Sequence, residues 1–496
     1  MSQPPSHPFP HPAYARYVLQ PQFEDSKRHL FAAMLDANEA HVLMLAARRI
    51  LSRDHAASLL DALHRIREEG TAAFAYAPSV EDLFFAVEAR LIDLAGTEAG
   101  GNLQLARSRN DLGAALHRMA LRERLADARR QVLDLRATLV QLAERHTGTL
   151  MPGITHTQPA QPTTLAHYLL GVLGPLERDS DRLAAAYHRT NQSPLGVAAF
   201  TTTSFPIDRA HLARLLGFTG CVENGYDAVG AGDHLMEAVQ ALVPSVGSLS
   251  RFVHDLLIWA RQTEHALVID DAFVQISSIM PQKRNPVVLE HIRVRIGWVY
   301  GEAAAVQTII HNAAFGDTND VEDPVFVPIH RAFDAAESVY RLLQAVIATA
   351  RIDVAGLARR AAEGNTTATA LADALVQAHG VPFRAAHAIV ARAVAEAMQA
   401  GVPLSGQLIN EASETVLGAP LNISDAVVQA ALDPSAFVRA RTLPGGPAPD
   451  TTRRALDAAR ARLAQDRAAL KADLDRLRAA GTERATQARA LRSASG

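Results

Sequence analysis

The stretch LGAALHRMALRERLADARRQVLDLRATLVQLAERH, residues 112–146, decides the fold class. Its apolar side chains step alternately by four and three residues, which is the spacing of a helical-bundle seam. A helix of this length measures about 50 Å at 1.5 Å per residue, far longer than a typical globular helix. The stretch therefore predicts one long helix packed lengthwise against others, with a seam formed by Leu121, Leu125, Ala128, Val132, Leu135, Leu139 and Leu142.

Similar long apolar patterns recur in four later segments. Pro175 and Pro244 lie inside two of them, so kinks or breaks are expected there. Strand patterns are nearly absent, and five striped segments joined by polar loops predict an all-α fold around a central helical bundle. Their apolar faces are larger than the interior of one bundle can bury, which predicts self-association. The four segments are 164–189, 227–261, 287–312 and 325–352.

Shorter helices are predicted on both sides of this bundle. The Pro/His-rich start predicts a disordered tail, and the residues after it follow helical spacing with short breaks. Near the other end, leucine recurs every seven residues in a charge-rich helix, as a packing stripe. The predicted organisation is a tail at 1–22, an N-terminal helical domain at 23–111, a central long-helix bundle domain at 112–364 and a C-terminal helical domain at 365–496.

Composition excludes several classes of protein. A net charge of -3 lacks the basic face that a nucleic-acid partner needs. Cys221 is the single cysteine, which rules out an intrachain disulfide and leaves no zinc-ligand spacing. No window has the roughly 18 uninterrupted apolar residues of a membrane span, and the start is not signal-like. We expect a cytoplasmic protein that binds neither nucleic acid nor a membrane.

Two polar stretches open long helices. The first is Arg107-Ser-Arg-Asn-Asp111, which places arginines and an amide at a helix N-terminus, where carboxylates bind well. Capping of the helix by Asn110 or Asp111, with the arginines solvated, explains the same residues equally well. In residues 151–162, three prolines hold Thr155, His156 and Gln158 in a stiff backbone. A lone histidine is most often structural or simply exposed. A third stretch, 193–227, reads as a capped loop.

The most unusual polar stretch is Ser277-Ser-Ile-Met-Pro-Gln-Lys-Arg-Asn-Pro286, held between two prolines ahead of a long apolar helix pattern. Ser277 can act as a base only where its hydroxyl is deprotonated, which demands nearby positive charge and desolvation. Lys283 and the following helix supply part of this. No histidine is close in sequence, so a serine protease-like triad is not indicated.

These motifs carry a family resemblance. Residues 277–286 are similar to the signature of the fumarase/aspartase superfamily, and the wider set resembles its argininosuccinate lyase branch. The matching order and spacing cover roughly Phe23 to Ala400. The motifs are RSRND at 107–111, MPGITHTQPAQPTTLAH at 151–167, PLG at 194–196, TSFPIDR at 203–209 and VPFRAAH at 381–387.

The resemblance implies an anti-elimination that splits a C–N bond in an N-substituted aspartate and releases fumarate. Ser277 would remove the Cβ proton, while Lys283 and Asn285 would stabilise the aci-carboxylate that forms. His156 would pair with Glu290 and assist protonation of the leaving amine. No metal or organic cofactor is expected.

The same resemblance implies substrate-binding groups and an assembly. The family forms homotetramers in which each active site takes residues from three subunits, which accounts for the scatter of the polar stretches along the chain. The substrate-binding residues would be Ser108, Arg109, Asn110, Thr155, Gln158, Ser278, Asn285 and Asn38.

Several departures from the branch pattern fall where its members contact the leaving amine. Phe84 replaces a histidine, Gln104-Leu-Ala replaces His-Thr-Gly, Asn38 replaces a serine and Leu112 a glutamine. Residues 315–323 replace a Tyr-Asn-(Arg/Lys)-Asp-x-Gln-Glu-Asp-Lys pattern and lose its closing lysine. We therefore hypothesise an amine other than arginine, with ethylenediamine-disuccinate as a candidate substrate. The alternatives are a non-enzymatic structural homologue, and adenylosuccinate lyase or aspartase-type activity.

Overall fold

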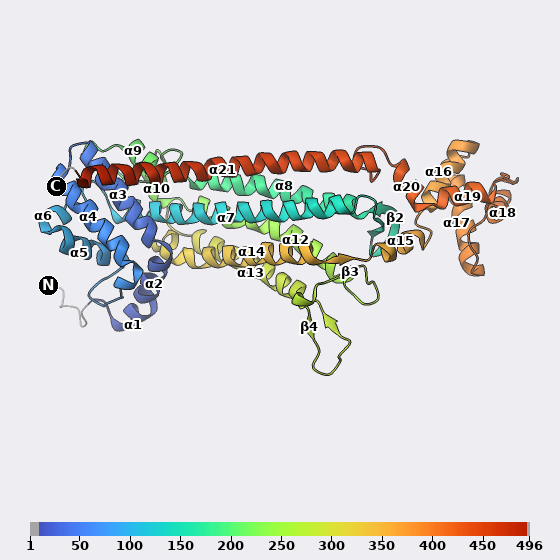
Figure 1. The fold of residues 1–496 in the computed structure, drawn as a ribbon, viewed down its shortest axis with the longest axis horizontal. Coiled ribbons are helices and arrows are strands. Elements are labelled where there is room, and N and C mark those ends of the chain that lie inside the picture. Colours follow the sequence, from blue (N-terminus) through green and yellow to red (C-terminus); the bar gives the residue numbers. More distant parts are fainter. Residues whose placement is uncertain (1–8, 494–496) are drawn as a thin grey trace.

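A computed structural model describes residues 9–493 of the chain. The molecule is elongated, with short N-terminal helices at one end, long parallel-running helices in the middle and a second group of short helices at the far end (Figure 1). Helices dominate, and the all-α prediction is confirmed. The predicted domain boundaries themselves stay a prediction.

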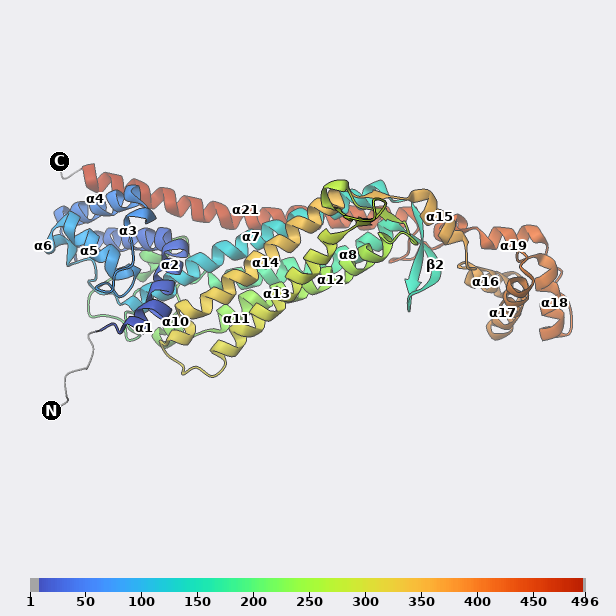
Figure 2. The same ribbon diagram turned by 90° about the horizontal axis from the view of Figure 1, so that it is seen from below.

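The middle of the molecule consists of long helices whose apolar stripes meet in one large core. Four of the five predicted segments are single helices: α7 (Arg109–Arg145), α8 (Leu165–Thr190), α13 (Val287–Ile310) and α14 (Asp323–Thr349). The turned view shows α14 running beside α7, with α13 along the other side of α14 (Figure 2). All seven seam residues named from the sequence are buried.

The two prolines at which kinks or breaks were expected, Pro244 and Pro175, have different effects. The segment 227–261 divides into α10 (Gly225–Gly230), α11 (Asp233–Gln240) and α12 (Leu242–Trp259). The last break immediately precedes Pro244, whose ring fits the first turn of a helix, where no backbone N–H is needed. Pro175, in contrast, lies inside α8, which continues past it without interruption.

The N-terminal helices pack around a second apolar core. Residues 1–8 of the expected tail lie outside the described residues, and from Pro12 onward the chain is helical rather than disordered. Ala15 and Leu19 are buried there, which gives this segment an apolar anchor that its prolines concealed. The elements are α1 (Pro12–Tyr14), η1 (Ala15–Leu19), α2 (Gln20–His29), α3 (Phe31–Ala47), α4 (Arg53–Glu69), η2 (Thr71–Ala73), α5 (Leu83–Ala95) and α6 (Thr97–Gly100).

The far end of the molecule has a third, smaller core. A few short elements complete the chain: α9 (Arg209–Leu215), η3 (Asp271–Phe273) and η4 (Asn319–Val321). The helices of the far end are α15 (Val354–Ala362), α16 (Ala368–His379), α17 (Phe383–Ala400), α18 (Gly406–Leu417), α19 (Asp425–Leu432) and α20 (Pro434–Ala440).

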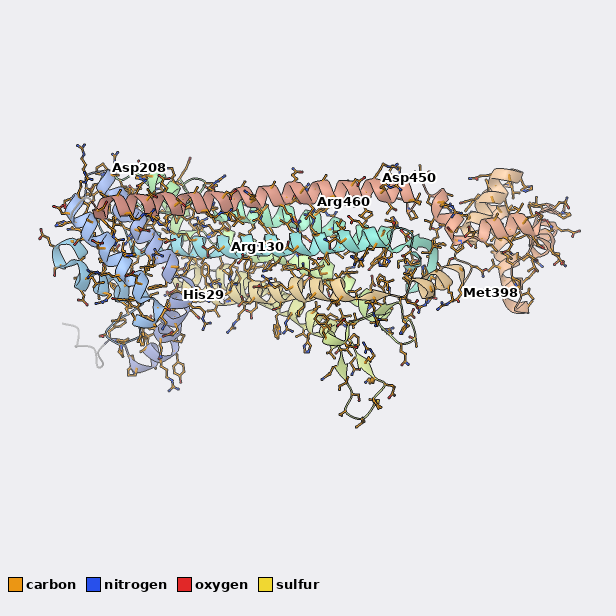
Figure 3. The ribbon with its side chains drawn as sticks, viewed as in Figure 1. His29, Arg130, Asp208, Met398, Asp450 and Arg460 are labelled. Carbon is orange, nitrogen blue, oxygen red and sulfur yellow. The ribbon has the colours of Figure 1, made fainter. Side chains whose placement is uncertain are left out.

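The last helix, α21 (Pro449–Ser493), runs back along the bundle to the N-terminal helices (Figure 1). Its predicted leucine stripe is buried at Leu456, Leu463 and Leu470. Ion pairs reinforce the contact: Arg129 reaches Asp473 at 2.8 Å, and Arg460, which Figure 3 labels on α21, donates to Glu144 at 2.6 Å. The helix therefore joins both ends of the molecule.

Three two-stranded antiparallel sheets depart from the helical plan. They are β1 (Leu150–Thr155) with β2 (Gln158–Thr164), β3 (Leu267–Val268) with β6 (Arg351–Ile352), and β4 (Gln275–Ile276) with β5 (Arg284–Asn285). Prolines at 152, 159 and 162 favour extended backbone and exclude a helix in the first of them. Two of these hairpins carry predicted site residues.

Among residues 9–493, no single helix is both long and apolar enough to cross a bilayer. The pair Pro12–His29 and Phe31–Ala47 passes by length and composition when taken together, with a bend of 70° between its two parts.

Candidate active site

The N-terminus of α7 holds the first group of predicted site residues. Ser108 caps the helix: its hydroxyl oxygen accepts from the backbone N–H of Asn110 at 3.3 Å. The Asp111 carboxylate in turn accepts from the backbone N–H of Ser108 at 3.0 Å. The other carboxylate oxygen of Asp111 accepts from the backbone N–H groups of Gly196 and Ala198. Neither Asn110 nor Asp111 is therefore the N-cap, and the Asn110 Oδ1 accepts from the Ser108 hydroxyl at 2.6 Å.

Arg109 lies beside this cap and is held in place by acidic and aromatic neighbours. Its guanidinium donates to Asp82 at 2.9 Å, lies 3.7 Å from Glu81 and stacks over the Phe85 ring, 4.7 Å from its centroid. Asp82 itself caps α5 by accepting from Phe85. Burial raises the pKa of Asp82, while its backbone bond and Arg109 act against that rise.

The segment 315–323 closes over the same place. The Asn110 amide donates to the Asp317 carboxylate. Burial, followed by the charge of Asp317, raises the pKa of Glu322 to about 7. Asp323, which replaces the expected lysine, points inward instead, accepting from Ser26 at 3.3 Å and contacting His117 at 2.9 Å. Asp317 and Glu322 therefore add to the acidic groups, Glu81 and Asp82, that lie near Arg109.

The other departures from the branch pattern lie inside the protein. Phe84 and Leu112 belong to the N-terminal apolar core, and Gln104 accepts a bond from the Nε of Arg107 at 2.7 Å. Asn38, predicted as a substrate contact, is only 1% exposed, and its Oδ1 has no hydrogen-bond partner. Of these changes, Gln104 contacts the RSRND motif at Arg107, and the segment 315–323 contacts it at Asn110.

His156 lies at the tip of the β1–β2 hairpin. His156 (φ 51°) and Thr157 (φ 66°) both adopt the left-handed conformation, and the flanking residues Thr155 and Gln158 pair with each other. Two consecutive positive φ angles are typical of the tight hairpin turn that matches strand twist, and they are costly for residues other than glycine. The turn presents an exposed His156 rather than burying it.

The signature loop is the connection of the β4–β5 hairpin, which projects from the bundle (Figure 1). The hydroxyl oxygen of Ser277 accepts from the backbone N–H groups of Ile279, at 3.3 Å, and Met280, at 3.1 Å. Donors aimed at this oxygen stabilise negative charge on it. Arg284 anchors the base of the hairpin by donating to the Ile269 carbonyl oxygen at 3.1 Å.

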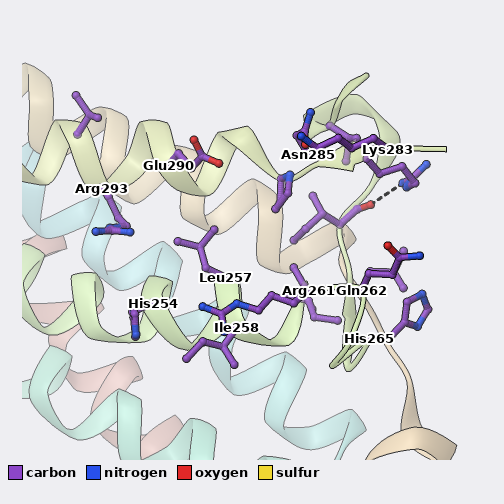
Figure 4. A pocket seen from close by; sticks show the side chains of 18 of the residues that line it. His254, Leu257, Ile258, Arg261, Gln262, His265, Lys283, Asn285, Glu290 and Arg293 are labelled. Carbon is purple, nitrogen blue, oxygen red and sulfur yellow. Dashed lines mark hydrogen bonds between the residues drawn. The ribbon is translucent and has the colours of Figure 1, made fainter. Parts of the chain in front are cut away.

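A cavity of about 1300 Å³ lies between this loop, α12 and α13. Figure 4 shows Lys283 and Asn285 on the loop side and Glu290 on α13, facing His254 on α12 and Arg261 in the turn after it. The lining is rich in cationic groups and suits an anionic ligand. Ser278 lies outside this lining, in the exposed part of the loop.

A single chain does not bring all the predicted groups together. Ser108, Arg109 and Asn110 lie at the N-terminus of α7, while the β1–β2 hairpin follows its C-terminus. The 37-residue helix spans about 55 Å. Within residues 9–493, His156 and Glu290 form neither a hydrogen bond nor an ion pair with each other. One chain therefore leaves the predicted set in separate groups.

Comparison with known proteins places these motifs in a family. A family model described as Lyase matches residues 16–301, more than half of the chain. The chain belongs to this lyase family. A second model, described as Argininosuccinate lyase C-terminal, matches residues 365–439 of this lyase. The predicted membership of the fumarase/aspartase superfamily, in its argininosuccinate lyase-like branch, is thereby confirmed.

Relatives match this lyase over most of its length. It is 39% identical over 432 residues to the argininosuccinate lyase of Methanothermobacter thermautotrophicus, covering 86% of this chain and 92% of the relative. It is 37% identical to that of Methanosarcina mazei, covering 91% and 92%. Among solved structures, EDDS lyase in complex with formate matches with a TM-score of 0.87 at 30% identity, covering 98% and 96%.

Three features of this lyase were missed by reasoning from the sequence. The backbone donors to Ser277 follow from a serine turn, which a hydroxyl residue in a proline-flanked loop signals. His254 lies on α12 and Arg261 in the turn that follows it, and both line the cavity beside the signature loop. The contact between Asn110 and Asp317 joins segments about 200 residues apart, and no local pattern predicts it.

Proposed function

We propose that this lyase releases fumarate from an N-substituted aspartate by anti-elimination, with Ser277 as the base. The observation that carries the proposal is the pair of backbone N–H donors on the Ser277 hydroxyl oxygen, in a loop whose Lys283 and Asn285 line a cationic cavity. The donors stabilise the alkoxide that takes the Cβ proton. The reaction is reversible, so the same groups serve the addition of an amine to fumarate.

The charge that develops in the reaction lies on the carboxylate next to Cβ. Lys283 supplies a positive charge, and Asn285 supplies an amide donor, to the aci-carboxylate. His156, paired with Glu290, assists protonation of the departing amine. The elimination then breaks the Cα–N bond, and the electron pair of the former Cβ–H bond becomes the double bond of fumarate.

We propose further that the enzyme is a homotetramer whose active sites are shared between subunits. Carboxylates of the substrate bind Ser108, Arg109, Asn110 and Thr155, with Gln158 and Ser278 nearby. The separation of these groups within one chain supports the proposal. So does an exposed apolar face on α13, where Val294 is 51% and Trp298 55% exposed, one helical turn apart.

The leaving amine is proposed to be other than arginine. Asp317 and Glu322, near Arg109, favour an amine that carries its own positive charge. Ethylenediamine-disuccinate, which has a second nitrogen, is the specific candidate, and the match to EDDS lyase supports it. We place the reaction in the cytoplasm.

The function is tested with purified protein, fumarate and a panel of amines that includes ethylenediamine and arginine. Fumarate absorbance follows addition and elimination. We expect reaction with ethylenediamine and none with arginine. Fumarate turnover with arginine would show that the leaving amine is arginine after all. Turnover only with ammonia or only with adenylosuccinate would establish an aspartase-type or adenylosuccinate lyase activity. Absence of reaction with every amine would favour a non-enzymatic role.

A further inference from the structure

The hairpin that presents His156 is tied to the C-terminal helices at two points. The Gln161 amide on β2 donates to the Thr369 hydroxyl oxygen on α16 at 3.0 Å. His167, in the first turn of α8, contacts the carbonyl oxygen of Gly445 at 2.8 Å, in the loop that leads into α21. The base of the hairpin therefore does not rest on the bundle alone.

The His167 ring joins two segments through its two nitrogens. A carbonyl oxygen only accepts, so Nε2 carries the proton and donates it to Gly445. In the neutral ring Nδ1 then accepts, and the Thr163 hydroxyl lies 2.7 Å from it. Thr163 belongs to β2 and pairs with Met151 across the hairpin. One imidazole thus links the hairpin, the start of α8 and the loop before α21.

This link matters because one side of the hairpin faces open space. A cavity of about 1100 Å³ lies between the hairpin, α12 and the segment 437–447, with Thr155, Thr163 and His167 in its lining. A two-stranded hairpin is marginally stable on its own. Contacts with α15 and α20 and the bonds at its base therefore set its direction, and a small rotation at the base moves its tip, where His156 lies.

We propose that His167 is a positioning residue for the reaction: by joining Thr163 to Gly445 it holds the β1–β2 hairpin in the direction that places His156 at the leaving amine. The proposal rests on the proposed function, since it takes His156 as the group that assists departure of the amine. His167 acts through His156 and touches no reacting atom. The C-terminal helices thereby contribute to catalysis without lining the site.

Two near-isosteric variants separate the two bonds of the ring. His167→Gln keeps an N–H donor near the position of Nε2 and so retains the bond to Gly445. His167→Asn is too short for that bond but keeps a polar group near Thr163. Each variant keeps one bond and loses the other, and the link needs both, so we expect kcat to fall about tenfold or more in His167→Asn and in His167→Gln. KM should rise as well, because Thr155, one of the carboxylate-binding residues, lies on the same hairpin.

Amide hydrogen exchange supplies a readout that does not need turnover. We expect amides of residues 150–164 to exchange faster in His167→Asn than in the wild type, and amides of the signature loop to exchange at unchanged rates. His188→Asn is the matched control: it lies on the same helix, half exposed, with its nearest carboxylate, Asp473, 3.9 Å away. It should alter neither kcat nor exchange.

Three results would overturn the proposal. The first is wild-type kcat in His167→Asn, and the second is wild-type kcat in His167→Gln. The third is a loss of kcat in His167→Asn with unchanged exchange at 150–164. Absence of lyase activity in the wild type would instead refute the proposed function, and the catalytic role of His167 with it, while the exchange data would still show whether His167 restrains the hairpin.

Discussion

The backbone nitrogen of Met280 lies 3.1 Å from the hydroxyl oxygen of Ser277 and donates to it. Because the chain turns back on itself at this point, the N–H of Ile279 reaches the same oxygen. A neutral serine hydroxyl is a weak base, and the alkoxide is the form that takes a proton. Fixed donors stabilise that alkoxide and so make it available. The turn of the signature loop supplies these donors without calling on another residue's side chain.

Mixed tetramers should recover activity from two inactive variants. Ser277→Ala and Arg109→Met each remove one component of every site. If the two components of a site come from different subunits, a one-to-one mixture assembled together leaves about a quarter of the sites intact. We expect about a quarter of wild-type kcat after co-refolding or co-expression. No recovery, with mixed assembly verified by mass spectrometry, would place both residues in the same subunit's site.

Asp317 should select for a cationic amine. Asp317→Asn removes a charge beside Arg109 while keeping a group able to accept from Asn110, so we expect kcat/KM for ethylenediamine addition to fall about tenfold and KM for fumarate to change little. Asp320→Asn, an exposed neighbour in the same segment, is the control and should change neither constant. Equal losses for ethylenediamine and an uncharged amine would show that Asp317 acts only on local structure.

Stability should fall as the pH drops below 6.5. Burial lowers the pKa of His41 and of His330 to about 3, and that of His234 to about 4, from an ordinary 6.5. Between these values the unfolded chain binds protons that the folded chain does not, so acidification favours unfolding, by about 1.4 kcal/mol per pH unit for each histidine. The pKa of Glu322 is about 7 against an ordinary 4.5, so for this one group acidification favours the folded chain instead.

The measurement is denaturant unfolding at several pH values between 7.5 and 4.5, at one protein concentration. His330→Phe keeps the ring stacked beside His29 and removes one titrating group. It should make the unfolding free energy less dependent on pH, by about one histidine's share. His379→Gln, exposed at the end of α16, should leave the dependence as it is. The same pH dependence in His330→Phe and the wild type would contradict the assignment.

The sequence predicts the bundle better than the loops because the two depend on different physics. A long helix is recognised in the sequence by the repeated spacing of its apolar residues, and α13 begins at Val287 as expected. The β1–β2 hairpin has no such repeat, and only its pairing with neighbours reveals it. The early helices before Phe23 were hidden by prolines that fit helix N-termini, and their stability comes from burying residues such as Leu19.

The candidate site shows the same division. Residue types at 277–286 indicate anion chemistry, but the position of the Ser277 hydroxyl depends on a turn that its side chain makes with its own backbone. Asn38 occupies a position that the family pattern assigns to substrate, and the packing of α3 buries it. Contacts between distant segments, such as Asn110 with Asp317, depend on the assembled fold.

Fumarate release by Ser277→Ala, on the substrate that the amine panel identifies, tests the central claim most directly. The control is Ser338→Ala, an exposed serine that bonds only to the backbone of α14. The account predicts a fall in kcat of at least about a thousandfold for Ser277→Ala, with the assembly and the affinity for fumarate retained. Turnover within tenfold of the wild type in Ser277→Ala would contradict the assignment of Ser277 as the base.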